Sequence, residues 1–217
     1  MRGLLLQECQ SMGLFGSKKK HDDAQAREAA ARELGLLFDA ADTTRIDPVD
    51  FFLIPGGRPY GASNVLSGHV GPTEIRIFDW SAHRPTDPMP ELAGFAGLGR
   101  GTIKMTAALV GLPSAVRTLL LTRGRTATTR GLPQLATGNA ELDSRFVCHT
   151  YRPELAGKLD EPGFVAALIG CPDDVSVEFT EQSLLVVGQR RGAEQLTLFA
   201  RSAIAVAAAT PSALFAP

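Results

Sequence analysis

Two adjacent residues, Cys148 and His149, have the side chains of a nucleophilic pair. Such a pair becomes reactive when the imidazole accepts the thiol proton. The residue pattern around them predicts a strand over 146–151, and neighbours on a strand point to opposite faces of a sheet. The two side chains should therefore not meet, and we interpret Cys148 as a buried thiol that packs as a small hydrophobic residue. Cys171 follows a predicted short helix, where we expect it to pack rather than to act as an exposed reactive thiol.

Three other residues, His69, Asp79 and His83, have the donor types that bind divalent metal ions. The sequence predicts a hairpin with strands at 64–70 and 74–80. His69 then lies near the turn, and Asp79 lies far along the partner strand. Because strand residues rise ~3.3 Å each, the gap is too long for shared ligation, and we predict no metal site.

The stretch from His83 to Gly101 is rich in proline and glycine and predicts a loop of unusual length. The glycines of 94–101 resemble a phosphate-binding loop in composition. Their spacing matches neither the GxGxxG pattern nor the P-loop pattern. A strand follows them, so no helix N-terminus awaits an anion, and we interpret 94–101 as a linker.

Arginines gather in the middle of the sequence, and they could clamp phosphate groups or an acidic partner. The alternative is a solvated, turn-rich edge, since arginine is mostly exposed. We expect Arg190–Arg191 to be a solvated hairpin end. The four residues of the central group are Arg117, Arg123, Arg125 and Arg130.

The segment 12–20 combines Leu14 and Phe15 with three lysines, and it forms a basic amphipathic tip if Met12 is the start. Such a tip could touch anionic lipid, although lipid recognition usually takes ~4–8 basic residues. The aspartates at 22–23 offset its charge. We therefore expect a flexible tail over 1–21, with weak membrane-surface contact as the alternative.

The chain has 217 residues, 44% of them hydrophobic, and a formal net charge of -1. This length suits one domain, which we place at 22–210 before a tail at 211–217. Nucleic-acid-binding domains usually carry a basic surface, so we expect no nucleic-acid partner. Three widely spaced cysteines without a CxxC motif predict reduced thiols. No apolar run reaches the ~18 residues of a membrane-spanning helix, so we expect a cytoplasmic protein.

The elements follow from hydrophobic periodicity and turn residues. Helices and strands do not alternate regularly, so we predict an α+β fold with a mainly antiparallel sheet. The predicted helices are 22–38, 160–169 and 193–208. Asp160 is the predicted cap of the second of these helices. The predicted strands are 51–54, 64–70, 74–80, 103–110, 116–122, 146–151, and a C-terminal hairpin of 175–179 and 184–187 around a turn at 180–183.

Two blocks of sequence resemble a family of uncharacterised actinobacterial proteins. The first block consists of residues 64–68, with the sequence Asn-Val-Leu-Ser-Gly, followed by residues 75–80, which end in Phe-Asp-Trp. The second block consists of residues 142–147 followed by residues 184–187. The residues in these blocks are mostly structural. Members of that family usually have an additional membrane segment, which we do not expect in this sequence. The resemblance implies no particular activity.

Two functions remain open. The first is a non-enzymatic binding or accessory module that presents strand edges and the long loop to a protein partner. The second is a small-molecule or lipid binder with an apolar pocket. A weaker third is a thiol-dependent hydrolase that uses Cys148 or Cys171. We predict no catalytic residue, cofactor-binding residue or metal ligand. The residues that would line the apolar pocket are Phe78, Trp80, Met105 and Leu109.

Overall fold

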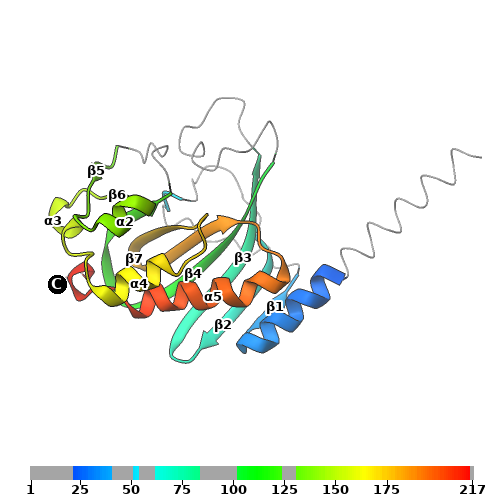
Figure 1. Ribbon diagram of the computed structural model, residues 1–217. Coiled ribbons are helices and arrows are strands. Elements are labelled where there is room, and N and C mark those ends of the chain that lie inside the picture. Colours follow the sequence, from blue (N-terminus) through cyan, green and yellow to red (C-terminus); the bar gives the residue numbers. More distant parts are fainter. Residues whose placement is uncertain (1–21, 41–50, 54–61, 84–101, 124–130, 216–217) are drawn as a thin grey trace, which may run out of the picture.

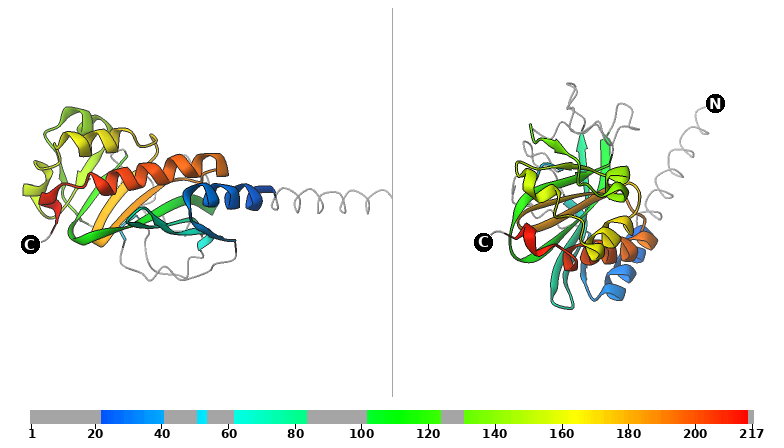
Figure 2. Two further views of the ribbon diagram at one scale, coloured as in Figure 1. Left: turned by 90° about the horizontal axis from the view of Figure 1, so that it is seen from below. Right: turned by 60° about the vertical axis from the view of Figure 1, so that its left-hand side comes forward.

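The computed structural model describes residues 22–40, 51–53, 62–83, 102–123 and 131–215. It is an α+β fold in which helices lie on one face of an antiparallel sheet (Figures 1 and 2). The predicted fold class is therefore confirmed. Within these ranges, the sheet has seven strands: β1 (Leu37–Asp39), β2 (Ala62–Val70), β3 (Thr73–His83), β4 (Thr102–Thr122), β5 (Gln134–Leu135), β6 (Val147–His149) and β7 (Ser176–Gln189).

The strand order is β1-β2-β3-β4-β6-β5, and β7 pairs with β4. The predicted hairpin is β2 and β3, which turn at residues 71–72. Strand β4 is central, because β3 pairs with its first part and β6 with its last residues. Strand β7 follows β4 along the opposite edge.

The prediction of two strands at 103–110 and 116–122 is wrong, because both belong to the continuous strand β4. The pairing of β4 with β7 shifts register between Gly111 and Val116. Pro113 lies in this irregular part, where its missing N–H does not interrupt a regular ladder. A bulge therefore replaces the predicted break.

The predicted C-terminal hairpin is also wrong. Val177 pairs with Leu121, and Leu185 pairs with Leu109, so both halves belong to the single strand β7. The residues 180–183 contain no Gly, Asn or Asp, which tight hairpin turns favour. Instead, Glu181 alone adopts a positive φ of 47°, and the strand bends there without reversing.

The N-terminal helix spans 22–34 and ends earlier than the predicted Phe38. Gly35 has a φ of +72°, and the Leu36 amide donates to the Ala31 carbonyl at 2.8 Å. These features are those of a glycine-terminated helix end. The chain then enters β1, which pairs with β2.

The remaining helices are α2 (Ala140–Arg145), α3 (Pro153–Ala156), α4 (Pro162–Ile169), α5 (Ala193–Ala208) and the 3-10 turn η2 (Ser212–Leu214). Helix α5 has the predicted bounds. The prediction that Asp160 caps α4 is wrong, because the N-cap is Glu161 and no side chain bonds there. The sequence prediction missed α3 and also α2, although Asn139 caps α2 by accepting the amides of Glu141 and Leu142.

Two further segments differ from expectation. In the predicted strand 51–54, Phe51 is irregular, residues 52–53 form a bend, and Ile54 lies outside the described residues. Part of the predicted tail 211–217 packs on the fold, because Leu214 is buried and Phe215 forms a backbone bridge with Val116.

Both faces of the sheet are apolar. The first face packs against α4, α5 and the N-terminal helix, with α5 lying across the strands (Figure 1). The opposite face of the sheet, which we call the second face, has its own cluster of buried apolar residues. Strand alternation separates the two, because Leu184 and Val186 point to the helices while Leu185 and Val187 point to the second face.

Candidate functional site: the second face of the sheet

The second face is lined by side chains from the three longest strands. The predicted lining residues Phe78, Trp80 and Met105 lie together in it, and Leu109 packs against them partly buried. The four residues therefore share one buried apolar cluster, and their role as the lining of a ligand pocket stays a prediction. Further members from the same strands are Ala107, Leu120, Leu185 and Val187.

A short segment, Phe51–Leu53, packs on this face, and we call it the strap. Phe51 and Leu53 are buried members of the cluster, and Phe52 packs against it partly exposed. The strap is held by Glu178 of β7, whose side chain is fully buried. One carboxylate oxygen accepts the Phe52 amide at 2.9 Å, and the other accepts the Leu53 amide at 2.8 Å.

Polar groups gather at one end of the second face. Leu120 of β4 pairs with Glu178 on one side and with His149 on the other, so the three lie side by side across the sheet. The Thr122 hydroxyl lies 3.2 Å from His149 Nε2, and both residues are buried. Burial lowers the pKa of His149, which keeps its imidazole neutral at pH 7.

Cys148 and His149 do not form a dyad. Cys148 belongs to the helix-side core, whereas His149 lies on the other face. Burial raises the pKa of the Cys148 thiol to about 12. Cys171 is buried too, and its Sγ lies 3.4 Å from the Ala167 carbonyl oxygen. Burial raises the pKa of Cys171 to about 11, although nearby Arg123 opposes this shift.

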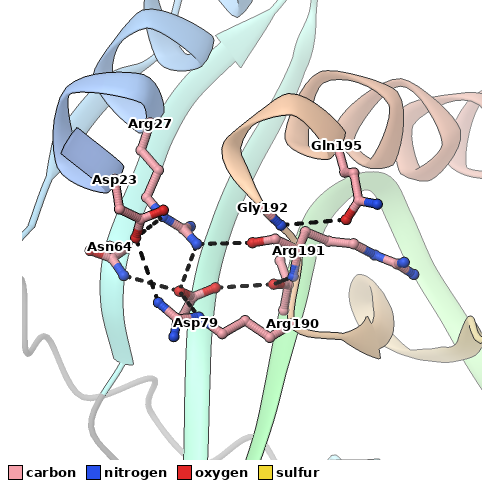
Figure 3. Close-up of polar contacts among 9 residues, drawn as sticks. Asp23, Arg27, Asn64, Asp79, Arg190, Arg191, Gly192 and Gln195 are labelled. Carbon is pink, nitrogen blue, oxygen red and sulfur yellow. Dashed lines mark hydrogen bonds and ion pairs between the residues drawn. The ribbon is translucent and has the colours of Figure 1, made fainter. Parts of the chain in front are cut away.

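Asp79 is the centre of a different polar network, shown in Figure 3. Its Oδ2 accepts hydrogen bonds from Asn64 at 3.0 Å and from Arg190 Nε at 3.1 Å, and pairs with Arg27 at 3.1 Å. Its Oδ1 accepts the Thr106 hydroxyl at 3.0 Å. The carboxylate that could have bound a metal ion is therefore fully engaged by protein donors.

The two histidines considered with Asp79 as metal-binding candidates do not lie beside it in the described structure. His69 pairs with Glu74 next to the turn, whereas Asp79 pairs with Ser63 near the opposite end of the hairpin. The side chain of His83 is outside the described part. Within the described ranges, no group of three or more metal-binding side chains occurs.

Arg27 connects the N-terminal helix to this network, and its side chain is 2% exposed. It donates to Asp23 Oδ2 at 3.1 Å and to the Arg191 carbonyl at 2.9 Å (Figure 3). The network thus ties the helix to β3 and to the connection between β7 and α5. The prediction of a solvated Arg190–Arg191 is wrong for the second residue, because Arg191 pairs with Asp174 and is 12% exposed.

The central arginines bind backbone carbonyls where the structure describes them. Arg123 donates to the carbonyls of Arg145 and Pro172 and lies 4.3 Å from the centre of the Phe146 ring. Burial lowers the pKa of Arg123. Arg117 donates to the Ala213 carbonyl at 3.5 Å.

Several sequence predictions fall on other parts of the chain. Arg125 and Arg130, the segment 12–20 and the glycines of 94–101 lie outside the described residues. Among the helices that are described, none has the length and apolar content to cross a bilayer.

Comparison with known proteins gives one informative result. No family model and no curated protein matches the chain. Among solved structures, the crystal structure of the mycobacterial trehalose monomycolate transport factor A, TtfA, matches with a TM-score of 0.62. The match covers 86% of this chain and 93% of that chain, at 11% sequence identity. The two proteins share a fold.

Proposed function

We propose that this protein is a non-enzymatic accessory factor in lipid transport, and that it holds an acyl chain on the second face. The observation that carries this proposal is a second apolar surface on the sheet, opposite the face that the helices cover. Its shared fold with a protein described as a trehalose monomycolate transport factor supports the same class of function. The combination joins the accessory role and the lipid-binding role that the sequence leaves open.

The physical case rests on burial of apolar surface. Each methylene removed from water contributes about 0.8 kcal/mol, so ten buried methylenes contribute roughly 8 kcal/mol before entropy is lost. Aromatic rings and the flexible side chain of Met105 adapt to a chain of variable shape. The strap already places the apolar side chains of Phe51 and Leu53 on this surface.

The raised pKa values of Cys148 and Cys171 argue against the thiol-dependent hydrolase. A cysteine nucleophile reacts as the thiolate, and catalytic cysteines have lowered pKa values. Thiols with pKa values of about 12 and about 11 are protonated at pH 7.

We also propose that the protein acts in the cytoplasm with a protein partner, beside the membrane from which the lipid comes. The basic segment 12–20 supports contact with anionic lipid, because Lys18–Lys20 gain electrostatic attraction near such a surface. The actinobacterial family that the sequence resembles would then share this role.

The lipid site can be tested with Trp80, the single tryptophan of the chain and a member of the second face. A fatty acid with bromine atoms on its acyl chain quenches tryptophan only at short range. We expect saturable quenching of Trp80 fluorescence on titration with this fatty acid below its micelle concentration. Quenching that rises linearly without saturation, as from collisions alone, would contradict a site on the second face.

Leu184 and Leu185 provide a matched pair of variants, because both are fully buried neighbours on β7. Leu185→Ala removes side-chain contacts on the second face and should change the lipid dissociation constant several-fold. Leu184→Ala removes equal volume from the helix side and should leave that constant within about twofold. Both should lower the free energy of unfolding by about 2–5 kcal/mol, which separates binding from stability.

A further inference from the structure

Leu198 is a large apolar side chain that α5 exposes to solvent. It is 61% exposed, whereas Leu196 and Phe199 on the same helix are buried. Leu198 borders a groove of about 620 Å³ between α5 and the N-terminal helix, which lie side by side (Figures 1 and 2). Both helices cover the first face of the sheet, so this groove is separate from the second face.

The floor of the groove consists of small side chains. Ala26, Ala29 and Ala30 come from the N-terminal helix, and Ala193 comes from α5. Because alanine projects little beyond the backbone, another helix can approach this surface closely, and a large side chain can fill it. The groove therefore has room for an apolar side chain of the size of leucine.

Charges of opposite sign lie on the two sides of Leu198 along α5. Glu194, Leu198 and Arg201 occupy positions i, i+4 and i+7, so they form one stripe on the helix surface. Among the described residues, no hydrogen bond or ion pair engages the Glu194 carboxylate. Arg201 donates to Glu33 at 3.4 Å through one nitrogen, and its side chain is 67% exposed. The other donors of this guanidinium are therefore available to a second carboxylate.

The stripe on α5 is complementary to itself when its direction is reversed. If two copies of α5 pack antiparallel about a two-fold axis near Leu198, Glu194 meets the partner's Arg201 at each end. The two leucines then meet at the axis, next to the alanine floors of both grooves. A parallel arrangement would bring Glu194 against the partner's Glu194, and such like-charge contacts are costly.

We propose that this groove is a dimer interface, and that its occupant is a second copy of this chain with the two α5 helices antiparallel. A two-fold interface is closed, so association stops at the dimer. The interface involves only two helices of each copy, so the dimer is weak, with a dissociation constant in the micromolar range. The second face of each copy lies on the other side of its sheet, so the dimer goes beyond the proposed lipid-binding function and does not rest on it.

Sedimentation equilibrium of the full chain measures this association directly. The average mass should rise from the monomer value of 23.0 kDa towards twice that value as the concentration increases through the micromolar range. Leu198→Ala should weaken the association about tenfold or more, because it removes an apolar contact from both copies. Leu37→Ala is the matched control, since Leu37 is 78% exposed on β1 but does not line the groove. This variant should associate as the wild-type protein does.

An exchange of charges tests the antiparallel arrangement. Glu194→Arg and Arg201→Glu each place like charges at both ends of the interface, so neither variant should associate by itself. In an equimolar mixture of the two, both ends again carry opposite charges. The mixture should therefore form a heterodimer with a dissociation constant within a few-fold of the wild-type value. Circular dichroism of each variant verifies that it is folded.

Each outcome decides a part of the proposal. A constant mass of 23.0 kDa for the wild-type protein at every concentration would overturn the dimer, and this measurement needs no variant. Association that Leu198→Ala leaves unchanged would overturn the assignment of the interface to this groove. Failure of the two folded charge variants to associate when mixed would overturn the antiparallel pairing of Glu194 with Arg201.

Discussion

Cys148 and Cys171 are enclosed by the apolar side chains of the helix-side core, and this environment decides their chemistry. Burial disfavours the charged thiolate and raises both pKa values, to about 12 and about 11. Strand alternation also places His149 on the face opposite Cys148. The sequence suffices to predict this separation, because the period of a strand is a local property.

The raised thiol pKa values predict slow alkylation and a loss of stability at high pH. In the folded protein at pH 8, both described cysteines should react with iodoacetamide far more slowly than in urea. A thiol in the unfolded chain titrates near its ordinary value of 9.0, so the unfolded state releases protons before the folded state does. The free energy of unfolding should therefore fall as the pH rises from about 9 to 11.

Substitution of both cysteines by alanine provides the control for this pH effect. The double variant should show a smaller decrease in the free energy of unfolding over the same pH range. Rapid labelling of Cys148 or Cys171 in the folded wild-type protein at pH 8 would contradict the assignment of inert thiols.

At the scale of the elements, β4 and β7 show why local patterns mislead. Each half of either strand is apolar and is separated from the other half by polar or turn-forming residues, so each half predicts a separate strand. Each strand is continuous because β7 pairs along the length of β4. The pairing shifts register in one region, around Val116 of β4. The helix α5 was predictable, because its buried stripe of Leu196, Phe199, Ala203 and Val206 has helical spacing within one segment.

The positive φ at Glu181 leads to a prediction for the bend in β7. A left-handed conformation costs an L-residue roughly 1–2 kcal/mol, and glycine avoids this strain. Glu181→Gly should therefore leave the free energy of unfolding unchanged or raise it by up to about 1 kcal/mol. Chemical denaturation in urea measures this change.

The neighbouring residue Gln182 gives the matched control, because it is also exposed and its φ is not positive. Gln182→Gly should lower the free energy of unfolding by about 0.5–1 kcal/mol, since glycine weakens an extended strand. A loss at Glu181→Gly as large as that at Gln182→Gly would show that no strain is relieved at the bend.

At the scale of the whole molecule, the Asp79 network fastens the N-terminal helix to the sheet and to the start of α5 (Figure 3). Its members come from distant parts of the sequence, and Asp79 and Arg190 are 111 residues apart. The only sign of this network in the sequence is Asp79 itself, an aspartate within an apolar strand. The partners could not be inferred, because no local spacing connects them.

Asp79→Asn should destabilise the protein strongly. The change leaves the guanidinium of Arg27, which is 2% exposed, without its buried counter-charge. Breaking a buried ion pair typically costs about 3–5 kcal/mol, and urea denaturation should show a loss of this order.

Asp23→Asn provides the comparison, because Asp23 binds the same Arg27 but its side chain is 39% exposed. That change should lower the free energy of unfolding by about 1 kcal/mol or less, as expected for an exposed pair. Equal effects of the two substitutions would contradict a buried role for Asp79.

The sequence by itself determined the fold class, the strand hairpin of β2 and β3, and the helix α5. These properties follow from periodicity and turn residues, which act over a few neighbouring positions. Only the tertiary structure decided that β4 and β7 are continuous, that Asp79 is held by Arg27 and Arg190, and that Glu178 holds the strap. These depend on contacts between residues distant in sequence, because burial and charge pairing arise only when the chain brings such residues together.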